Sequence, residues 1–311
     1  MYVQRRRTRV DIWAPAKLNL FLEVLSRRAD GFHEIETLMV PIDCFDTLRI
    51  SLRDDEDIVL ACRWAAGIRE VSEEIPTGAD NLVTRALTLL RRRVQESRGA
   101  LPASGRGLSV ELVKRIPSAA GLGGGSSDAA AALYGANLLW QLGWSRQQLA
   151  GVASELGSDI PFFLDGGAAF CRGRGELIEP VNWEAGQYFV VLRPPQGLAT
   201  AAVYRSVEVP ATPQQWCNEF ARDWPSHLFN RLQQAARSQA PWLELIEREF
   251  SRLDLVAHQM SGSGSSYFGV CRNARHANWA AAILRHRCQG RVMVVRSLAY
   301  DLPYAIQASQ N

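Results

Sequence analysis

The chain has 311 residues, of which 47% are hydrophobic and 22% charged, enough apolar material for packed cores in two domains of ordinary size. Its formal net charge of +3 is too small to indicate a nucleic-acid-binding protein, and no apolar run is long enough to span a membrane. Six widely spaced cysteines, without a Cys-x-x-Cys pair or a histidine cluster, favour reduced thiols in a cytoplasmic protein over disulfides or zinc.

The N-terminal half mixes strand patterns with helical patterns. Its basic start runs into Asp11-Ile-Trp-Ala-Pro-Ala-Lys17 rather than an apolar segment, so we expect no signal peptide. Period-2 alternation predicts strands at 46–52, at 108–116 and at 10–24, the last with a break at Pro15-Ala-Lys17. Helical patterns predict helices at 82–94 with Asp80-Asn81 as cap, at 126–143 opened by Ser126, Ser127 and Asp128, and at 145–157.

A change of composition after Phe163 marks the passage to a second domain, through the glycine-rich segments Asp165-Gly-Gly167 and Arg172-Gly-Arg-Gly175. We therefore expect an N-terminal domain over residues 1–170 and a C-terminal domain over residues 171–311. The later patterns predict strands at 188–193, 267–271 and 292–298, and helices at 228–237, 242–252 and 274–286. Because strands and helices do not alternate strictly, an α+β fold is favoured over a doubly wound sheet.

The most informative segment is Pro117-Ser-Ala-Ala-Gly-Leu-Gly-Gly-Gly-Ser-Ser-Asp128, between a predicted strand and an alanine-rich helix. Glycines allow positive φ and a close approach of the backbone to a ligand, and the start of a helix favours an anion. The segment therefore indicates a phosphate-binding loop in a nucleotide-dependent enzyme. It lacks the lysine of a Walker loop and has Ser126 where a dinucleotide fingerprint has glycine. The alternative is a tight turn whose glycines serve packing alone.

Lys17 and Asn19 are two residues apart in a predicted strand, which places them on one face of it. Of 35 basic residues only Lys17 and Lys114 are lysines, which favours a need for a compact ammonium group at position 17. Taken alone, a solvated lysine on a surface strand is the commoner explanation.

Two further segments offer groups for chemistry. Asp159, in Gly157-Ser-Asp-Ile-Pro-Phe-Phe163, directly precedes an apolar segment stiffened by proline. A general base is often placed beside apolar surface in this way, although turn aspartates are also common. Met260-Ser-Gly-Ser-Gly-Ser-Ser266 is a second glycine-serine loop, and it is either a flexible hairpin or another backbone segment that approaches phosphate.

In this order, Pro15-Ala-Lys-Leu-Asn-Leu20, the glycine loop and the late Ser-Gly-Ser-Gly-Ser segment resemble the three-motif layout of the GHMP small-molecule kinases. The resemblance implies an α+β, two-domain GHMP kinase fold with a ribosomal-protein-S5-like N-terminal domain and a ferredoxin-like C-terminal domain. It also implies ATP and Mg²⁺ as cofactors and phosphoryl transfer to an alcohol group, a reaction that depends mainly on positioning and charge neutralisation.

Two segments narrow the resemblance within the superfamily. Arg28-Ala-Asp-Gly-Phe-His-Glu34 is similar to the Arg-x-Asp-Gly-Tyr-His-Glu segment of the kinases that phosphorylate the 2-hydroxyl of 4-diphosphocytidyl-2-C-methyl-D-erythritol in the methylerythritol phosphate route to isoprenoids. Gly157–Phe163 is similar to their Gly-Ser-Asp-Val-Pro-Phe-Phe segment, and Asp80-Asn81-Leu82 also matches. Phe32 replaces the usual tyrosine, which keeps stacking but loses a hydrogen bond. Around Asn230 the match is too weak to assign a role, and residues 54–79 and 205–226 match no family segment.

The resemblance implies a role for each matching residue. Asp159 would accept the proton of the attacking hydroxyl, and Lys17 beside it would keep it ionised and orient that hydroxyl. The ATP-binding set would comprise Asn81 near the adenine and the loop residues Pro117, Ser118, Ala119, Ala120, Gly121, Leu122, Gly123, Gly124, Gly125, Ser126 and Ser127. The substrate-binding set would comprise His33 on the cytosine, Phe32 and Tyr204 stacked against it, and Asn19 and Thr200 near the hydroxyl.

Two other functions stay open on this reasoning. Another GHMP kinase, acting on homoserine, mevalonate or a sugar, would need no base-stacking pair such as Phe32-His33. A non-catalytic nucleotide-binding sensor would bind ATP without turnover, and would have no use for Lys17 and Asp159 together. The expected partners are ATP and a small molecule, cytidine diphosphate-linked methylerythritol, without nucleic acid or membrane, and the expected state is a monomer or weak homodimer.

Overall fold

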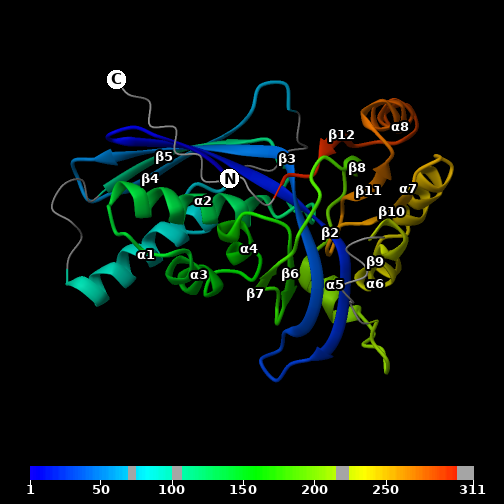
Figure 1. Cartoon of the computed structure of the whole chain (residues 1–311), viewed down its shortest axis with the longest axis horizontal. Helices are drawn as coiled ribbons and strands as arrows, with labels where there is room; N and C mark the ends of the chain where they lie inside the picture. The colour runs from blue at the N-terminus through cyan, green and yellow to red at the C-terminus, as the bar shows by residue number, and fades with distance from the viewer. Residues whose placement is uncertain (69–74, 100–106, 215–223, 300–311) are drawn as a thin grey trace.

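Two β-sheets organise the part of the chain that the computed structural model describes, namely residues 1–68, 75–99, 107–214 and 224–299. The larger sheet and its helices lie at one end of the long axis, and the smaller sheet with its own helices lies at the other (Figure 1). Helices and strands are mixed without strict alternation, so the expected α+β class is confirmed.

The larger sheet is built on a long antiparallel hairpin of β2 (Arg9–Arg27) and β3 (His33–Arg53). Within the described residues its order is β1-β2-β3-β5-β4, with β6 paired to β3 and β7, and β9 paired to β2. The other strands are β1 (Tyr2–Arg5), β4 (Ile58–Trp64), β5 (Gly107–Lys114), β6 (Ala169–Arg172), β7 (Leu177–Pro180) and β9 (Phe229–Asn230). The predicted break at Pro15-Ala-Lys17 is wrong: β2 continues through a register shift between Pro15 and Ala16, because a bulge accommodates a proline that cannot donate to the ladder.

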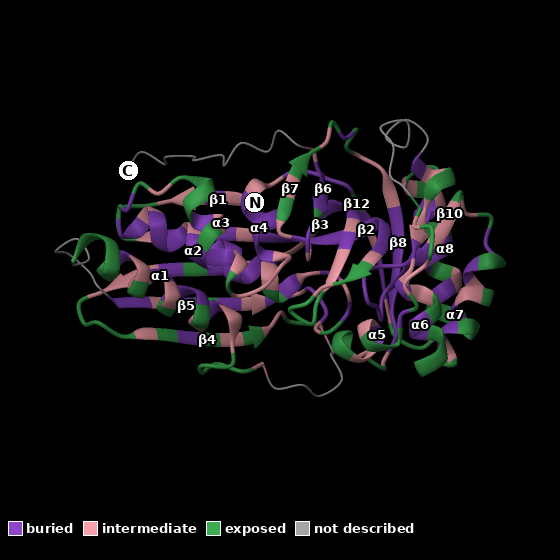
Figure 2. Cartoon of the chain, turned by 90° about the horizontal axis from the view of Figure 1, so that it is seen from below, coloured by how far each residue is buried: buried purple, intermediate pink, exposed green. Residues whose placement is uncertain are grey.

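Helices α1 (Leu82–Arg98), α2 (Gly124–Leu139), α3 (Arg146–Ser154) and α4 (Ile160–Asp165) gather on one side of this sheet (Figure 1). The ribbon of α2 is almost wholly buried (Figure 2), because its alanines let it lie close to β2 and β3 on one side and to α1 and α4 on the other. A Cβ added at Gly135 would come within 2.6 Å of Ile50 Cδ1, so the close approach requires glycine there.

The helix starts are set by local hydrogen bonds. Asn81 caps α1 as expected, since its Oδ1 accepts from Val83 N at 2.9 Å, and Ser145 and Gln148 form a capping box on α3. The expected start of α2 at Ser126–Asp128 is wrong. Gly123, at φ 71°, turns the chain directly into the helix, so Gly124 is the first helical residue and Ser126 belongs to the first turn.

The smaller sheet is antiparallel, with the order β10-β11-β8-β12 in the described residues. Its strands are β8 (Tyr188–Arg193), β10 (Ala257–Met260), β11 (Tyr267–Cys271) and β12 (Arg291–Arg296), and the helices of this half are α5 (Thr200–Ser206), α6 (Leu232–Gln239), α7 (Trp242–Ser251) and α8 (Ala274–Arg287), with a 3₁₀ turn η2 (Trp224–His227). Chain order and strand order together give the βαββαβ arrangement of ferredoxin-like folds. The predicted helix at 228–237 begins only at Leu232, because Phe229 and Asn230 pair with β2 as β9 instead.

The two sheets share an apolar cluster. Phe189 and Val191 of β8 pack with Leu18 and Leu20 of β2, while α7 and α8 cover the opposite face of the smaller sheet. Since side chains alternate along a strand, Lys17 and Asn19 point away from this cluster. The expected boundary at 170/171 falls inside β6, and the division into two domains stays a prediction.

The described cysteines, Cys44, Cys62, Cys171, Cys271 and Cys288, are free thiols, and Cys217 lies outside the described residues. Within the described ranges, no helix combines the length and apolar character needed to cross a membrane.

Candidate active site

A cavity of about 590 Å³ brings together segments from both halves of the chain. The predicted site residues that line it are Lys17, Asn19, Asn81, Pro117, Ser118, Ala119, Ala120, Gly121, Gly123, Gly124, Gly125, Ser126, Asp159, Thr200 and Tyr204. Four predicted residues are not part of this lining, namely Phe32, His33, Leu122 and Ser127. Leu122 is buried and its carbonyl accepts from Lys17 N at 3.0 Å, so it supports the strand that carries Lys17.

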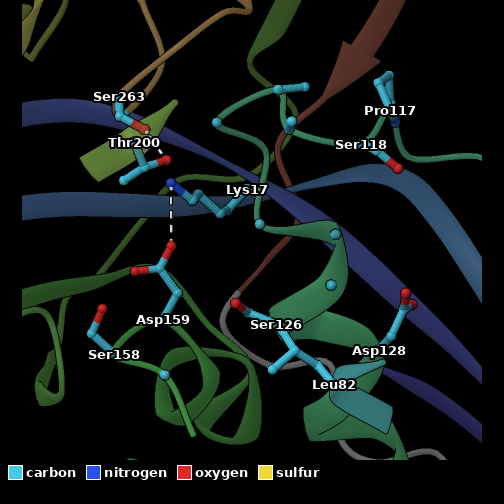
Figure 3. A pocket seen from close by; sticks show the side chains of 18 of the residues that line it. Lys17, Leu82, Pro117, Ser118, Ser126, Asp128, Ser158, Asp159, Thr200 and Ser263 are labelled. Carbon is cyan, nitrogen blue, oxygen red and sulfur yellow. Dashed lines mark hydrogen bonds and ion pairs between the residues drawn. The ribbon is translucent and has the colours of Figure 1, made fainter. Parts of the chain in front are cut away.

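Lys17 and Asp159 face each other across the cavity (Figure 3). The Lys17 Nζ lies 3.6 Å from the Asp159 Oδ2, with the lysine side chain 4% exposed and the aspartate side chain 35% exposed. Burial lowers the pKa of Lys17, and the neighbouring Asp159 carboxylate partly opposes that shift. A desolvated ammonium group therefore lies beside a carboxylate that a ligand can reach. Lys17 is thus not a solvated lysine on a surface strand, which was the alternative considered above.

A chain of hydrogen bonds orients the Lys17 side chain. Its Nζ donates to Asn19 Oδ1, the Asn19 Nδ2 donates to Thr37 Oγ1 at 2.8 Å, and the Thr37 hydroxyl donates to the Phe21 carbonyl at 2.6 Å. All three polar side chains are buried. Asn19 therefore holds the lysine, a role distinct from the substrate contact expected of it, and Thr37 was missed although alternation along its strand points it to the same side.

Asp159 occupies the N-cap position of α4, but its side chain makes no capping hydrogen bond. The five residues that follow, Ile160–Leu164, are buried, and Pro161 lies in the first turn of the helix, where no backbone donor is needed. The buried residues Ile160–Leu164 fix the backbone at Asp159, and its carboxylate lines the cavity. An ordinary turn aspartate would instead accept a hydrogen bond from its own backbone.

The glycines of the first loop are required both by the backbone conformation and by close packing. Gly121 and Gly123 each have φ of 71°, which other residues rarely adopt. Added Cβ atoms would lie 2.1 Å from Ser261 O at Gly121, 2.8 Å from Phe163 at Gly123 and 2.8 Å from Ile116 at Gly124. Packing thus requires these glycines, and the loop together with the first turn of α2 still borders an open cavity. The N–H groups and the dipole at that helix start favour an anion there.

The second glycine-serine loop is packed rather than flexible. Ser261 Oγ donates to the Gly121 carbonyl at 3.1 Å, and Ser266 N donates to the Ala120 carbonyl at 3.1 Å. Ser263 and Thr200 share a hydroxyl contact of 2.9 Å at the edge of the cavity (Figure 3). Since Asn19 N also donates to Ser261 Oγ at 3.3 Å, this loop joins the first glycine loop to the strand that carries Lys17.

Asn230, which received no role from the sequence, holds the second loop. Its Nδ2 donates to the carbonyls of Met260 and Gly262, each at 2.8 Å, and its Oδ1 accepts from Leu232 N at the start of α6. The partial match of Asn230 to the family pattern was the signal that could have identified it.

A buried ionic cluster lies beneath the first glycine loop. Lys114 Nζ donates to Asp46 and to Asp128 Oδ2, the latter at 2.6 Å, while Asp46 Oδ1 accepts from Ile116 N at 2.8 Å. Although burial opposes the charge, the two carboxylates raise the pKa of Lys114. Burial, reinforced by Asp46 and opposed by Lys114, raises the pKa of Asp128 to about 8. The cluster links β5, β3 and α2 at the start of the loop. In the sequence, the rarity of lysine at Lys114 was the one feature that pointed to this cluster.

The predicted cytosine-binding residues gather at the start of β3. The His33 ring centroid lies 5.4 Å from that of Tyr204, and His33 Nε2 is buried without a hydrogen-bond partner among the described residues. Burial and the nearby Arg27 lower the pKa of His33, which favours a neutral ring, and its unpartnered nitrogen can take one more hydrogen bond. The Phe32 side chain is 53% exposed.

Asn81 also lines the cavity, but its side-chain amide already makes hydrogen bonds. Its Oδ1 caps α1, and its Nδ2 donates to the Pro76 carbonyl at 2.6 Å. The expected position near the adenine stays a prediction.

Comparisons with known proteins agree with this geometry. Residues 81–167 match the family model of the GHMP kinases N terminal domain. A 4-diphosphocytidyl-2-C-methyl-D-erythritol kinase from Shouchella clausii is 36% identical over 89% of this chain and 91% of its own length. The protein of that name from Pelotomaculum thermopropionicum is 36% identical over 91% of this chain and 96% of its own length.

Solved structures extend the comparison to the fold. A crystal structure of 4-(cytidine 5'-diphospho)-2C-methyl-D-erythritol kinase superposes with a TM-score of 0.74 at 33% identity, covering 92% of this chain and 98% of its own. Homoserine kinase from Cytophaga hutchinsonii superposes with a TM-score of 0.68 at 18% identity, covering 96% of this chain and 97% of its own, which shows the fold alone. The expected GHMP kinase fold is therefore confirmed, and the chain belongs to the family of 4-diphosphocytidyl-2-C-methyl-D-erythritol kinases.

Proposed function

We propose that this protein transfers the γ-phosphoryl group of ATP to the 2-hydroxyl of 4-diphosphocytidyl-2-C-methyl-D-erythritol, in the methylerythritol phosphate route to isoprenoid precursors. The observation that carries the proposal is the Lys17–Asp159 pair, 3.6 Å apart, in a cavity bordered by the glycine loop. A kinase needs this combination of an accessible base, a fixed cation and a phosphate-binding loop, whereas a nucleotide sensor needs only the loop.

In the proposed reaction the Asp159 carboxylate accepts the proton of the substrate 2-hydroxyl as its oxygen attacks phosphorus. Lys17 neutralises charge between the carboxylate and the transferring group, and Asn19 and Thr37 keep its ammonium in place. The backbone of the loop from Pro117 to Ser126 binds the ATP phosphates at the start of α2. Ser261 and Asn230 act indirectly by fixing the two glycine loops against each other.

Mg²⁺ fits the same wall of the cavity. The Ser126 side chain lies in the first turn of α2 and lines the cavity (Figure 3), and oxygen is the ligand atom that Mg²⁺ prefers. When bound to the ATP phosphates, Mg²⁺ supplies charge neutralisation, and we assign the Ser126 hydroxyl to its binding. We further propose a cytoplasmic monomer or weak homodimer organised in two domains.

The test is ADP release by the purified protein with Mg²⁺ and ATP, compared among 4-diphosphocytidyl-2-C-methyl-D-erythritol, homoserine, mevalonate and galactose. Release with the cytidyl compound alone supports the proposal. Release with another compound keeps a GHMP kinase and rejects the assigned substrate. ATP binding without release in any case supports a sensor.

A further inference from the structure

Arg193, the last residue of β8, is a buried cation in contact with the first glycine loop. Its side chain is 9% exposed, and its Nη2 donates at 3.4 Å to the carbonyl of Ser118, a loop residue that lines the cavity. We propose that the charge of Arg193 strengthens the binding of the ATP phosphates to this loop without touching them. This inference rests on the function proposed above and adds a positioning residue to it.

The guanidinium of Arg193 has no carboxylate partner among the residues that the structure describes. Its Nη1 donates to the carbonyls of Pro194 and Pro195 at 2.7 and 2.9 Å, and its Nε is buried without a hydrogen-bond partner in the same part of the chain. The buried ammonium groups of Lys17 and Lys114, by contrast, lie beside aspartates. Because a buried cation is costly unless a negative charge compensates it, the surroundings of Arg193 favour an anion nearby.

The loop that Arg193 contacts is the part of the cavity wall suited to an anion. Ala119, which directly follows Ser118, has φ of 48°, a conformation that is uncommon for residues other than glycine, and Gly121 follows at 71°. The loop then leads into the start of α2, where N–H groups and the helix dipole favour negative charge. Since Ser118 lines the cavity and Arg193 is not part of the described lining, the loop backbone separates the guanidinium from a bound phosphate. Charges interact more strongly across protein than across water, so the attraction acts over this separation.

The smaller sheet fixes the position of Arg193 independently of the loop. β8 lies between β11 and β12, and Arg193 pairs with Arg291 of β12. A Cβ added at Gly290 would come within 2.3 Å of the Arg193 carbonyl oxygen, so the turn before β12 packs closely on this residue. The chain after Arg193 also reaches the loop, because a Cβ at Gly197 would lie 3.8 Å from the Ala119 Cβ. The second half of the chain therefore holds a positive charge at the phosphate-binding loop of the first half.

The experiment compares two variants of Arg193 in the full-length protein. Arg193→Gln removes the charge but keeps N–H groups that can donate to the neighbouring carbonyls, whereas Arg193→Lys keeps the charge. Calorimetry with Mg²⁺ measures the affinity for a non-hydrolysable ATP analogue and for adenosine. Arg193→Gln should weaken binding of the ATP analogue by about 10-fold and that of adenosine by less than about threefold, because adenosine carries no phosphate. Arg193→Lys should stay within about threefold of the wild type for both ligands.

Arg98, at the end of α1, supplies a matched control. Its Nη2 also donates to a backbone carbonyl, that of Leu142 at 2.7 Å, and it is not part of the described cavity lining. Arg98→Gln removes the same charge away from the loop and should bind both ligands as the wild type does. Kinetics add a second readout: Arg193→Gln should raise the KM for ATP by a factor similar to the loss of affinity, while kcat and the KM for the second substrate change by less than about threefold.

Three results would overturn the inference. Unchanged affinity of Arg193→Gln for the ATP analogue would exclude the charge effect, and an equal loss for the analogue and adenosine would assign Arg193 to shaping the loop alone. If Arg193→Gln did not fold, Arg193→Lys would decide, because a tenfold loss with the charge retained would also assign a purely structural role. Failure of the wild type to bind the ATP analogue would instead overturn the proposed function, and this inference with it, which is a distinct result.

Discussion

Lys17 and Lys114 are the two lysines of the chain, and both ammonium groups are buried beside aspartates. They differ in the number and the exposure of the carboxylates around them. Among the residues that the structure describes, Lys17 has one carboxylate partner, Asp159, which is 35% exposed, and the pKa of Lys17 is lowered. Lys114 has two such partners there, both buried, and the pKa of Lys114 is raised. The comparison teaches that one accessible carboxylate leaves an ion pair able to react with a ligand, whereas two enclosed carboxylates make the lysine a fixed part of the scaffold.

The largest expected effect comes from removing the reactive carboxylate. Asp159→Asn keeps the shape of the side chain but cannot accept a proton, so kcat should fall by about 10³-fold, within the range for general bases. ATP affinity should stay within about threefold, because the loop that binds the phosphates is untouched. Steady-state kinetics and ATP titration measure the two quantities. A kcat within about tenfold of the wild type would rule out the general-base role.

The second effect concerns the charge of Lys17. Lys17→Ala should lower kcat by about 10²-fold and raise the KM for ATP much less, because the charge acts on the transferring group. Since the pKa of Lys17 is lowered, its ammonium is lost as pH rises through a value below that of an ordinary lysine.

The pH profile tests this assignment directly. We expect kcat/KM for the substrate to decline on the alkaline side at a pH below the ordinary lysine range, and Lys17→Arg to shift that decline upward, since guanidinium stays charged. The same alkaline decline in the arginine variant would mean that another group titrates.

Lys114→Met should act on stability more than on chemistry. Removing the cation leaves Asp46 and Asp128 buried together without compensation, and breaking a buried pair in this way costs about 3–5 kcal/mol of unfolding free energy. Urea denaturation measures the loss, and kcat of the folded fraction should change by less than about tenfold. A large loss of kcat at unchanged stability would make Lys114 part of the catalytic machinery.

The smallest effect is expected at Asp128, whose pKa is raised by burial and by the neighbouring Asp46, against the opposing charge of Lys114. Because its folded-state pKa lies above the ordinary value of 3.8, the unfolded chain ionises at a lower pH than the folded chain, and wild-type stability should fall as pH rises above about 4. Asp128→Asn lacks this group, and its Tm relative to the wild type should therefore rise by a few degrees between pH 5 and pH 8. Calorimetry at both values checks the sign, and a fall in the relative Tm would mean that Asp128 is ionised when folded.

Elements with strong local signals were predicted well. The caps Asn81 and Ser145 identified the starts of α1 and α3, because a side-chain oxygen that binds a nearby backbone donor is a local event. Strands β1, β4, β6 and β7 and the first half of β3 were missed. Of these, β4 and β6 depend on pairing with β5 and β3, which lie far away in the sequence. The start of α6 was displaced for the same reason: pairing of Phe229 with Phe21 in β2 outweighs the local helical pattern.

The residue types and their order along the chain were enough to indicate a phosphate-binding loop, a candidate base at Asp159 and membership of the GHMP kinases, because these signals lie in short contiguous segments. Tertiary structure alone decided that Lys17 is buried against Asp159, that Asn230 holds the second loop and that the Arg174 guanidinium packs on the Phe32 ring. Each of these relations joins residues far apart in the chain, so its energy depends on burial and on charge pairing that exist only once the two sheets have packed.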